Sequence, residues 1–230
     1  NVGSKVDGLG RQNDLTYDQG GSGFLISSTD ALGRTTQFTN TKFGNLLNKT
    51  YPDGSMEKWT RDNLDLILTY TDQLGRVTKN TRDALHRITR IDYPDGTFET
   101  FTYNSFGQAL THRMRNGGIE SNIYNTQGLR TSFTDALGNV TTYTFDSADR
   151  EASVTDARGN TTIREYNERG LLIKFTNADS SFRTLTYDNF GNKTGETNEL
   201  GNSWTMVNDE FRRVKYREIR LLLEPYQEGI

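Results

Sequence analysis

The sequence contains no cysteine and, in 230 residues, only two histidines, three methionines and three prolines. Without cysteine the chain can form neither a disulfide nor a thiolate metal site, so the redox state of its compartment stays open. No run approaches the roughly 20 apolar residues of a membrane-spanning helix. Residues 1–4 match no signal peptide, and because the chain starts within its own pattern we expect it to be part of a longer protein.

An excess of charge of one sign is also missing. The 27 basic and 30 acidic residues are mixed along the chain and leave a net charge of −3. Binding to nucleic acid would call for a basic stripe, which this sequence does not have. Apolar residues are scarce as well, at 32%, so we expect a thin core. The 11 tyrosines, 12 phenylalanines and two tryptophans are nevertheless too many and too regular for a disordered chain.

What the sequence does contain is a repeat of 21 residues. A turn glycine, replaced by serine at position 180, recurs in one register, and its members are Gly33, Gly54, Gly75, Gly96, Gly117, Gly138, Gly159 and Gly201. A period of this size indicates a modular array, in which each unit buries its surface only against its neighbours. We assign the array to residues 1–213. Residues 214–230 are an atypical tail, for which a last strand, a short helix that caps the open sheet and a non-native junction all remain open.

A second series lies half a period away from the glycines. Over the middle of the chain it consists of an aromatic residue followed by Asp or Asn, and the aromatic members are Tyr103, Tyr124, Phe145, Tyr166 and Tyr187. Residues one period apart occupy equivalent sites in successive hairpins. We therefore predict that these rings form a ladder, each one hairpin from the next.

Between the turns lie short segments rich in Thr, Tyr, Phe, Val and Ile, as in 140–145 and 171–176, which predict β-strands. The turns read Asp-x-Leu-Gly-Arg or Tyr-Pro-Asp-Gly, in which Asp bonds its own backbone, Pro presets φ and Gly accepts φ > 0. The predicted fold is all-β, a long antiparallel strip of hairpins. One modestly apolar stripe, which the strip would cover by curling into a spiral or partial shell, contains Tyr70, Ile91, His112, Phe133, Val154 and Phe175.

The sequence gives little support for catalysis or metal binding. His86 stands at a turn-glycine position and His112 lies within the apolar stripe, so neither is predicted to be catalytic or to bind a metal. The recurring Asp and Gly suggest a calcium roll, but its nonapeptide rhythm is absent and Arg often follows the turn glycine, which weakens the attraction for a cation. We predict no enzymatic activity, no cofactor and no metal.

Several turn strings resemble the RHS or YD repeats of bacterial polymorphic toxins, insecticidal toxin complexes and teneurins. They are Thr-Asp-Ala-Leu-Gly-Arg at 29–34, Thr-Asp-Ala-Leu-Gly-Asn at 134–139 and Tyr-Asp-Asn-Phe-Gly-Asn at 187–192, and the resemblance covers roughly residues 5–213. It implies a β-sheet strip that spirals into a hollow shell, which in the toxins encloses a C-terminal effector domain. The arginine- and tyrosine-rich segment with the self-cleavage aspartates, which ends the shell in that family, has no counterpart after Arg213.

The resulting hypothesis is a structural section of a shell that encapsulates or scaffolds an effector domain, within a larger secreted or cell-surface bacterial protein. Its partners would be the covalently linked effector or neighbouring shell segments, and exposed strand edges would favour self-association. The alternative is a stand-alone carbohydrate-binding or adhesive module. For that function Trp59, Phe101 and Tyr143 are the candidates for stacking on sugars.

Overall fold

A computed structural model describes residues 2–6, 12–209 and 213–220 of the chain. Within these ranges the chain consists of 21 strands joined by turns, and contains no helix and therefore no helix that could span a membrane. The prediction of an all-β antiparallel fold is confirmed. The chain divides into two units, Asn1–Ile119 and Glu120–Ile230, which are described separately below.

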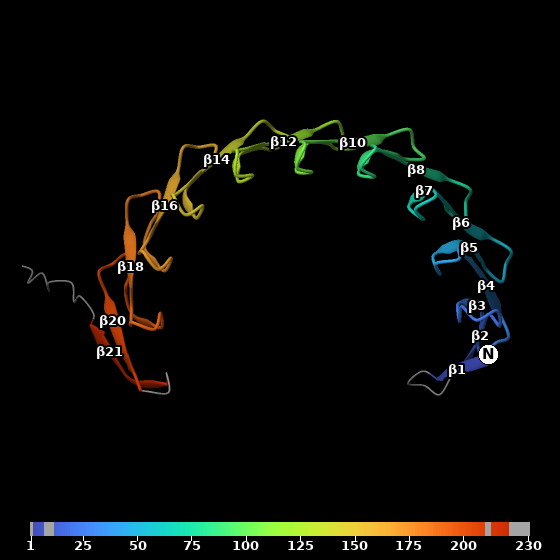
Figure 1. Ribbon diagram of the computed structural model, residues 1–230, viewed down its shortest axis with the longest axis horizontal. Coiled ribbons are helices and arrows are strands. Elements are labelled where there is room, and N and C mark those ends of the chain that lie inside the picture. Colours follow the sequence, from blue (N-terminus) through green and yellow to red (C-terminus); the bar gives the residue numbers. More distant parts are fainter. Residues whose placement is uncertain (1, 7–11, 210–212, 221–230) are drawn as a thin grey trace, which may run out of the picture. The chain divides into compact units, whose positions relative to one another are not determined.

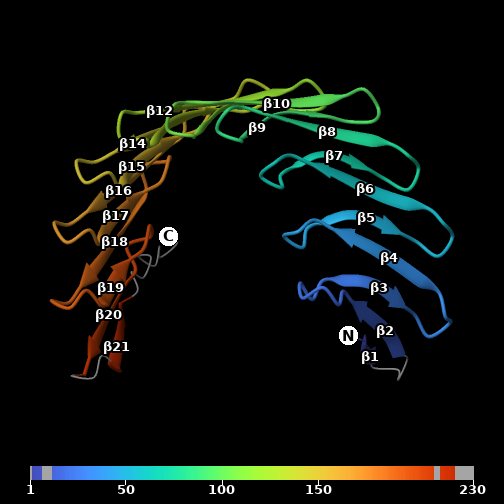
Figure 2. The ribbon, with the colours of Figure 1, turned by 45° about the vertical axis from the view of Figure 1, so that its right-hand side comes forward.

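The first unit is a meander in which each strand pairs antiparallel with the next one along the chain (Figures 1 and 2). Its strands are β1 (Val2–Val6), β2 (Gln12–Tyr17), β3 (Leu25–Thr29), β4 (Thr35–Asn40), β5 (Leu46–Thr50), β6 (Met56–Arg61), β7 (Ile67–Thr71), β8 (Val77–Arg82), β9 (Ile88–Asp92), β10 (Phe98–Tyr103) and β11 (Ala109–Arg113).

The second unit repeats the same plan of neighbouring antiparallel strands. Its strands are β12 (Ile119–Tyr124), β13 (Arg130–Thr134), β14 (Val140–Phe145), β15 (Glu151–Thr155), β16 (Thr161–Tyr166), β17 (Leu172–Thr176), β18 (Phe182–Tyr187), β19 (Lys193–Thr197), β20 (Ser203–Asn208) and β21 (Val214–Arg220). The series thus continues beyond Arg213 by one strand, and residues 221–230, where a cap was considered, lie outside the described residues.

The odd period of 21 has a structural cause. A five-residue strand, a five-residue turn, a six-residue strand and a second five-residue turn make one repeat, as from β3 to the turn after β4. At the second turn the register shifts, for example where Thr102 faces Thr111 but Tyr103 faces Ala109. The bulge leaves Leu110 without a partner opposite it. Because of this extra residue, equivalent side chains of the next repeat point to the same face of the sheet.

Each unit is a single layer with one better-covered face. In β6 the side chains of Glu57, Trp59 and Arg61 are half-buried, whereas Lys58 and Thr60 between them are exposed. No apolar side chain in the described part of the chain is buried, so the thin core expected from the composition is observed. Stability must therefore come from contacts between neighbouring strands rather than from a packed interior.

Candidate functional site

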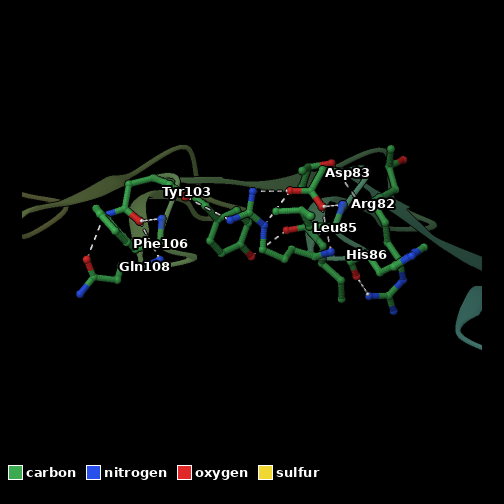
Figure 3. Close-up of polar contacts among 12 residues, drawn as sticks. Arg82, Asp83, Leu85, His86, Tyr103, Phe106 and Gln108 are labelled. Atoms are coloured by element: carbon green, nitrogen blue, oxygen red, sulfur yellow. Dashed lines mark hydrogen bonds and ion pairs between the residues drawn. The ribbon is translucent and has the colours of Figure 1, made fainter. Parts of the chain in front are cut away.

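The most regular feature of the structure is the five-residue turn, which an aspartate organises from its first position. In the turn that begins at Asp83, one carboxylate oxygen accepts hydrogen bonds from the backbone N–H groups of Leu85 (2.9 Å) and Arg87 (3.0 Å). The other oxygen of Asp83, which Figure 3 labels, accepts one from Arg87 Nε at 2.7 Å. The backbone closes twice, from Asp83 N to Arg87 O and from His86 N to Asp83 O, both at 3.0 Å.

This carboxylate arrangement recurs along the chain with Arg or Asn at the fifth position. The pairs are Asp30–Arg34, Asp72–Arg76, Asp135–Asn139, Asp146–Arg150, Asp156–Asn160, Asp188–Asn192 and Asp209–Arg213. A hydrogen bond from the fifth residue's side chain holds the pKa of Asp83 and of Asp146 below the ordinary carboxyl value. For Asp72 the backbone N–H of Arg76 has the larger effect in lowering the pKa. Each of these Asp-led turns is thus stabilised by an ionised aspartate.

The fourth position of the turn has a left-handed backbone. The eight glycines of the predicted series have φ between 76° at Gly33 and 90° at Gly117, where an L side chain would be strained. Four turns hold other residues in this conformation: Asp65, His86, Asp149 and Ser180, with φ between 60° and 69°. His86 therefore occupies a turn-glycine position in space as well as in sequence.

Tyrosines of the second predicted series link each hairpin to the preceding strand. The hydroxyl groups of Tyr103, Tyr166 and Tyr187 donate to the backbone carbonyls of Ile88 (2.8 Å), Glu151 (3.1 Å) and Leu172 (2.8 Å), in each case 15 residues earlier. Tyr124 is half-buried at the equivalent place, and so is Phe145, which has no hydroxyl.

Other donors replace the tyrosine hydroxyl in the early repeats. Asn40 Nδ2 donates to the carbonyl of Leu25 at 2.9 Å, and Arg61 Nε donates to that of Leu46 at 3.1 Å. These pairs have the same separation of 15 residues, so the same strand end is held by an amide, a guanidinium or a phenol. What Asn40, Arg61 and Tyr103 share at this position is a donor long enough to reach the preceding strand.

The turn arginines extend these links from one hairpin to the next. The Arg87 guanidinium lies 4.6 Å from the centre of the Tyr103 ring and donates to the carbonyl of Asn104 at 3.2 Å. Arg150 makes the same two contacts, with the Tyr166 ring at 4.7 Å and the carbonyl of Asn167 at 3.2 Å. One side chain thus closes its own turn and also contacts the aromatic ring and the backbone carbonyl at the start of the turn 21 residues later.

Two related clusters surround glutamates in the first unit. Glu57 accepts hydrogen bonds from Tyr51 (3.0 Å) and Tyr70 (2.8 Å), and the bond from Tyr70 is the main reason that the pKa of this phenol is raised to about 12. Forty-two residues later, Glu99 accepts one from Tyr93 at 3.0 Å and lies 2.9 Å from His112 Nε2, which lowers the pKa of Glu99.

The rings considered for sugar stacking contact cross-strand neighbours. Trp59 lies 5.2 Å from Tyr70 between ring centres, and Phe101 stacks on His112 at 4.5 Å. Tyr143, in the second unit, accepts a hydrogen bond from Arg130 at 3.2 Å, and that guanidinium lies 5.1 Å from its ring centre. All three rings are half-buried.

Sequence reasoning missed both the glutamate clusters and the contacts that the turn arginines make with the following repeat. The signals were present, since Tyr-Pro-Asp-Gly at 51–54 and 93–96 is followed in each case by a glutamate six residues after the tyrosine, and since Arg recurs four residues after the turn Asp. The structure brings no three His, Asp or Glu side chains together as a metal site within the ranges it describes.

Comparison with known proteins supports the family resemblance. The family model described as RHS Repeat matches residues 124–161 and 166–203. No curated protein matches the chain in sequence. The predicted resemblance is confirmed, and the matched stretches fall in the second unit.

Solved structures share the fold at low sequence identity. The crystal structure of TcdB2-TccC3 without hypervariable C-terminal region has a TM-score of 0.60 and 16% identity, and the match covers 93% of this chain and 13% of that one. TcdB2-TccC3-TEV gives a TM-score of 0.59 and 16% identity over 96% of this chain and 13% of that one. This chain therefore spans a small fraction of the proteins that share its fold.

Proposed function

We propose, from the RHS repeats that this chain carries, that it is a structural section of a shell that encloses or scaffolds an effector domain in a larger exported bacterial protein. The solved structures that share its fold are much longer, since the match covers 13% of their length. A section of this kind would work together with neighbouring segments of the same polypeptide. Its partners would be those segments and the linked effector.

The observation that carries the proposal is the way each hairpin is held. Arg87 and Tyr103 join one hairpin to the next, and Arg150 and Tyr166 repeat the arrangement in the second unit. These links run along a single layer whose apolar side chains are nowhere fully buried in the described part of the chain. A single-layer sheet that is stabilised by contacts between successive hairpins, and not by a packed core, is suited to form the wall of a shell.

The same contacts support a non-catalytic role. The groups that most often do chemistry are used to hold the sheet: Glu57 and Glu99 accept from tyrosines of adjacent segments, and His112 is stacked on Phe101. The turn aspartates are ionised and bound to the fifth residue of their own turns. Catalytic work would require such groups to be released from these contacts.

The first experiment measures the native polypeptide that carries this sequence, by immunoblot and intact mass spectrometry from the source cells. The expected result is a chain much longer than 26.1 kDa with sequence beyond Ile230. Limited proteolysis of that native chain should then leave the region downstream protected. A native product near 26.1 kDa, or a downstream region cut as fast as a denatured control, would contradict the proposal.

A further inference from the structure

Successive turns at one edge of the first unit carry a large apolar residue at their third position. These turns follow β4, β6, β8 and β10, and because neighbouring strands run antiparallel they all lie at the same edge of the sheet. The four residues, which are between 58% and 82% exposed, are Phe43, Leu64, Leu85 and Phe106. We call this row the apolar rim, and Figure 3 labels two of its members, Leu85 and Phe106.

Among the turns that the structure describes, an uninterrupted apolar row occurs only at this edge of the first unit. At the opposite edge of the same unit the third residues alternate between leucine and aspartate, as Leu32, Asp53, Leu74 and Asp95. In the second unit the turns that follow β12, β14, β16 and β18 have Gln127, Ala148, Arg169 and Phe190 at this position. The turn therefore accepts polar and charged residues here, and its geometry does not require the apolar rim.

The charged side chains beside the rim already have contacts within the first unit. Asp65 accepts a hydrogen bond from the Thr41 hydroxyl at 2.9 Å, and Asp83 is ion-paired with Arg87 at 2.7 Å. Lys42, at one end of the rim, has its Nζ 4.9 Å from the centre of the neighbouring phenyl ring. A surface that covered the rim would therefore remove apolar side chains from water without separating an ion pair.

The spacing of the rim indicates what covers it. Successive members are one hairpin apart, which is two strands or about 10 Å, so that the four of them extend over about 30 Å. The rim of a second copy has the same spacing and meets this one at every member. We infer that the apolar rim is a self-association surface, at which two copies of this chain pair rim against rim about a twofold axis. The inference is separate from the shell function, because it concerns only the first unit and a second copy.

The area of the rim corresponds to a weak dimer. A fully accessible phenylalanine side chain presents about 150–250 Å² and leucine somewhat less, so four members at 58–82% exposure present about 500 Å² per copy. Apolar patches of this size on a monomer are often functional. A dimer would bury about 1,000 Å² in total, which is at the lower end for specific interfaces, and should have a dissociation constant of about 10–100 µM.

The test is sedimentation velocity of the whole chain from about 1 to 200 µM, a range that includes the dissociation constant expected for so small an interface. The wild-type mass should rise from 26.1 kDa toward twice that value as the concentration increases. Leu64→Arg combined with Leu85→Arg should keep the chain monomeric over the whole range, because the interface would then bring guanidinium groups of both copies together. Its thermal midpoint should be unchanged, since Arg169 already occupies the equivalent turn position.

The matched control is Leu32→Arg combined with Leu74→Arg at the opposite edge. Both leucines are 77% exposed, and Arg158 occupies the equivalent position in the second unit. This variant should associate as the wild type does. A wild-type chain that stays monomeric, equal loss of association in the two double variants, or association that survives Leu64→Arg with Leu85→Arg would overturn the inference. The last result would assign self-association to the terminal strands β1 and β21 instead.

Discussion

The link between Tyr103 and the preceding strand gives a prediction that can be made quantitative. Tyr103→Phe removes one hydroxyl, which donates to the Ile88 carbonyl at 2.8 Å, and leaves the ring beneath Arg87. A hydrogen bond of this kind contributes about 1 kcal/mol to the free energy of unfolding. Tyr103→Ala also loses the cation–π contact and the half-buried ring, so its cost should be about 2–3 kcal/mol.

The chain supplies its own reciprocal variant. Phe145 occupies the equivalent place in the second unit, 15 residues after Arg130. Phe145→Tyr should therefore create the missing hydrogen bond and raise the free energy of unfolding by about 0.5 kcal/mol. If removal of the hydroxyl at Tyr103 lowers the free energy of unfolding and its addition at Phe145 raises it, the effect belongs to the hydrogen bond and not to the aromatic ring.

The assay is urea denaturation followed by circular dichroism, combined with hydrogen–deuterium exchange. Because each repeat contacts only its neighbours, Tyr103→Phe should increase exchange in β9–β11 and leave the second unit unchanged. The reasoning is refuted if Tyr103→Phe leaves the denaturation midpoint at the wild-type value, or if Phe145→Tyr lowers it. If hydrogen–deuterium exchange became faster to the same extent in both units, the premise that each repeat is stabilised only by its neighbours would be wrong.

The remaining predictions concern the turns. Asp83→Ala should lower the thermal midpoint more than Asp83→Asn, since Asn104 organises the turn 21 residues later through its side-chain oxygen; equal effects of the two substitutions would contradict this order. The turn aspartates have folded pKa values below the ordinary carboxyl value, so their stabilisation is complete above a pH of about 4 and is lost as the pH falls through the folded values; a thermal midpoint that is constant from neutral pH to about pH 2 would argue against it. His86→Gly, at φ 63°, should stabilise the chain by about 0.5–1 kcal/mol, whereas Gly138→Ala, at φ 84°, should destabilise it by about 1 kcal/mol in chemical denaturation; the reverse signs would exclude backbone strain as the cause.

Strands and turns could be predicted from the sequence because their signals are local. In most turns an Asp or Asn at the start and a Gly at the fourth position specify the backbone conformation through bonds within five residues. Repetition then places equivalent residues on neighbouring hairpins. For this reason the antiparallel fold and the left-handed turn positions follow from composition and spacing alone.

The links between hairpins could not be predicted because they depend on geometry across strands. The bulge at Tyr103 shifts the register by one residue, and only with that shift does the hydroxyl meet the Ile88 carbonyl. Such features become visible when the columns of the repeat are compared in space.

The bulge also bears on how such a gene can change in length. Because one repeat, with its bulge, returns the next strand to the same face, duplication of 21 codons would add one hairpin whose neighbours on both sides are already encoded. The Arg and Tyr of the new copy would meet the neighbours that every other copy meets. An insertion of a single residue within a strand would instead turn the following side chains to the wrong face. Recombination between repeats can therefore lengthen or shorten the array in whole steps without a new interface having to evolve.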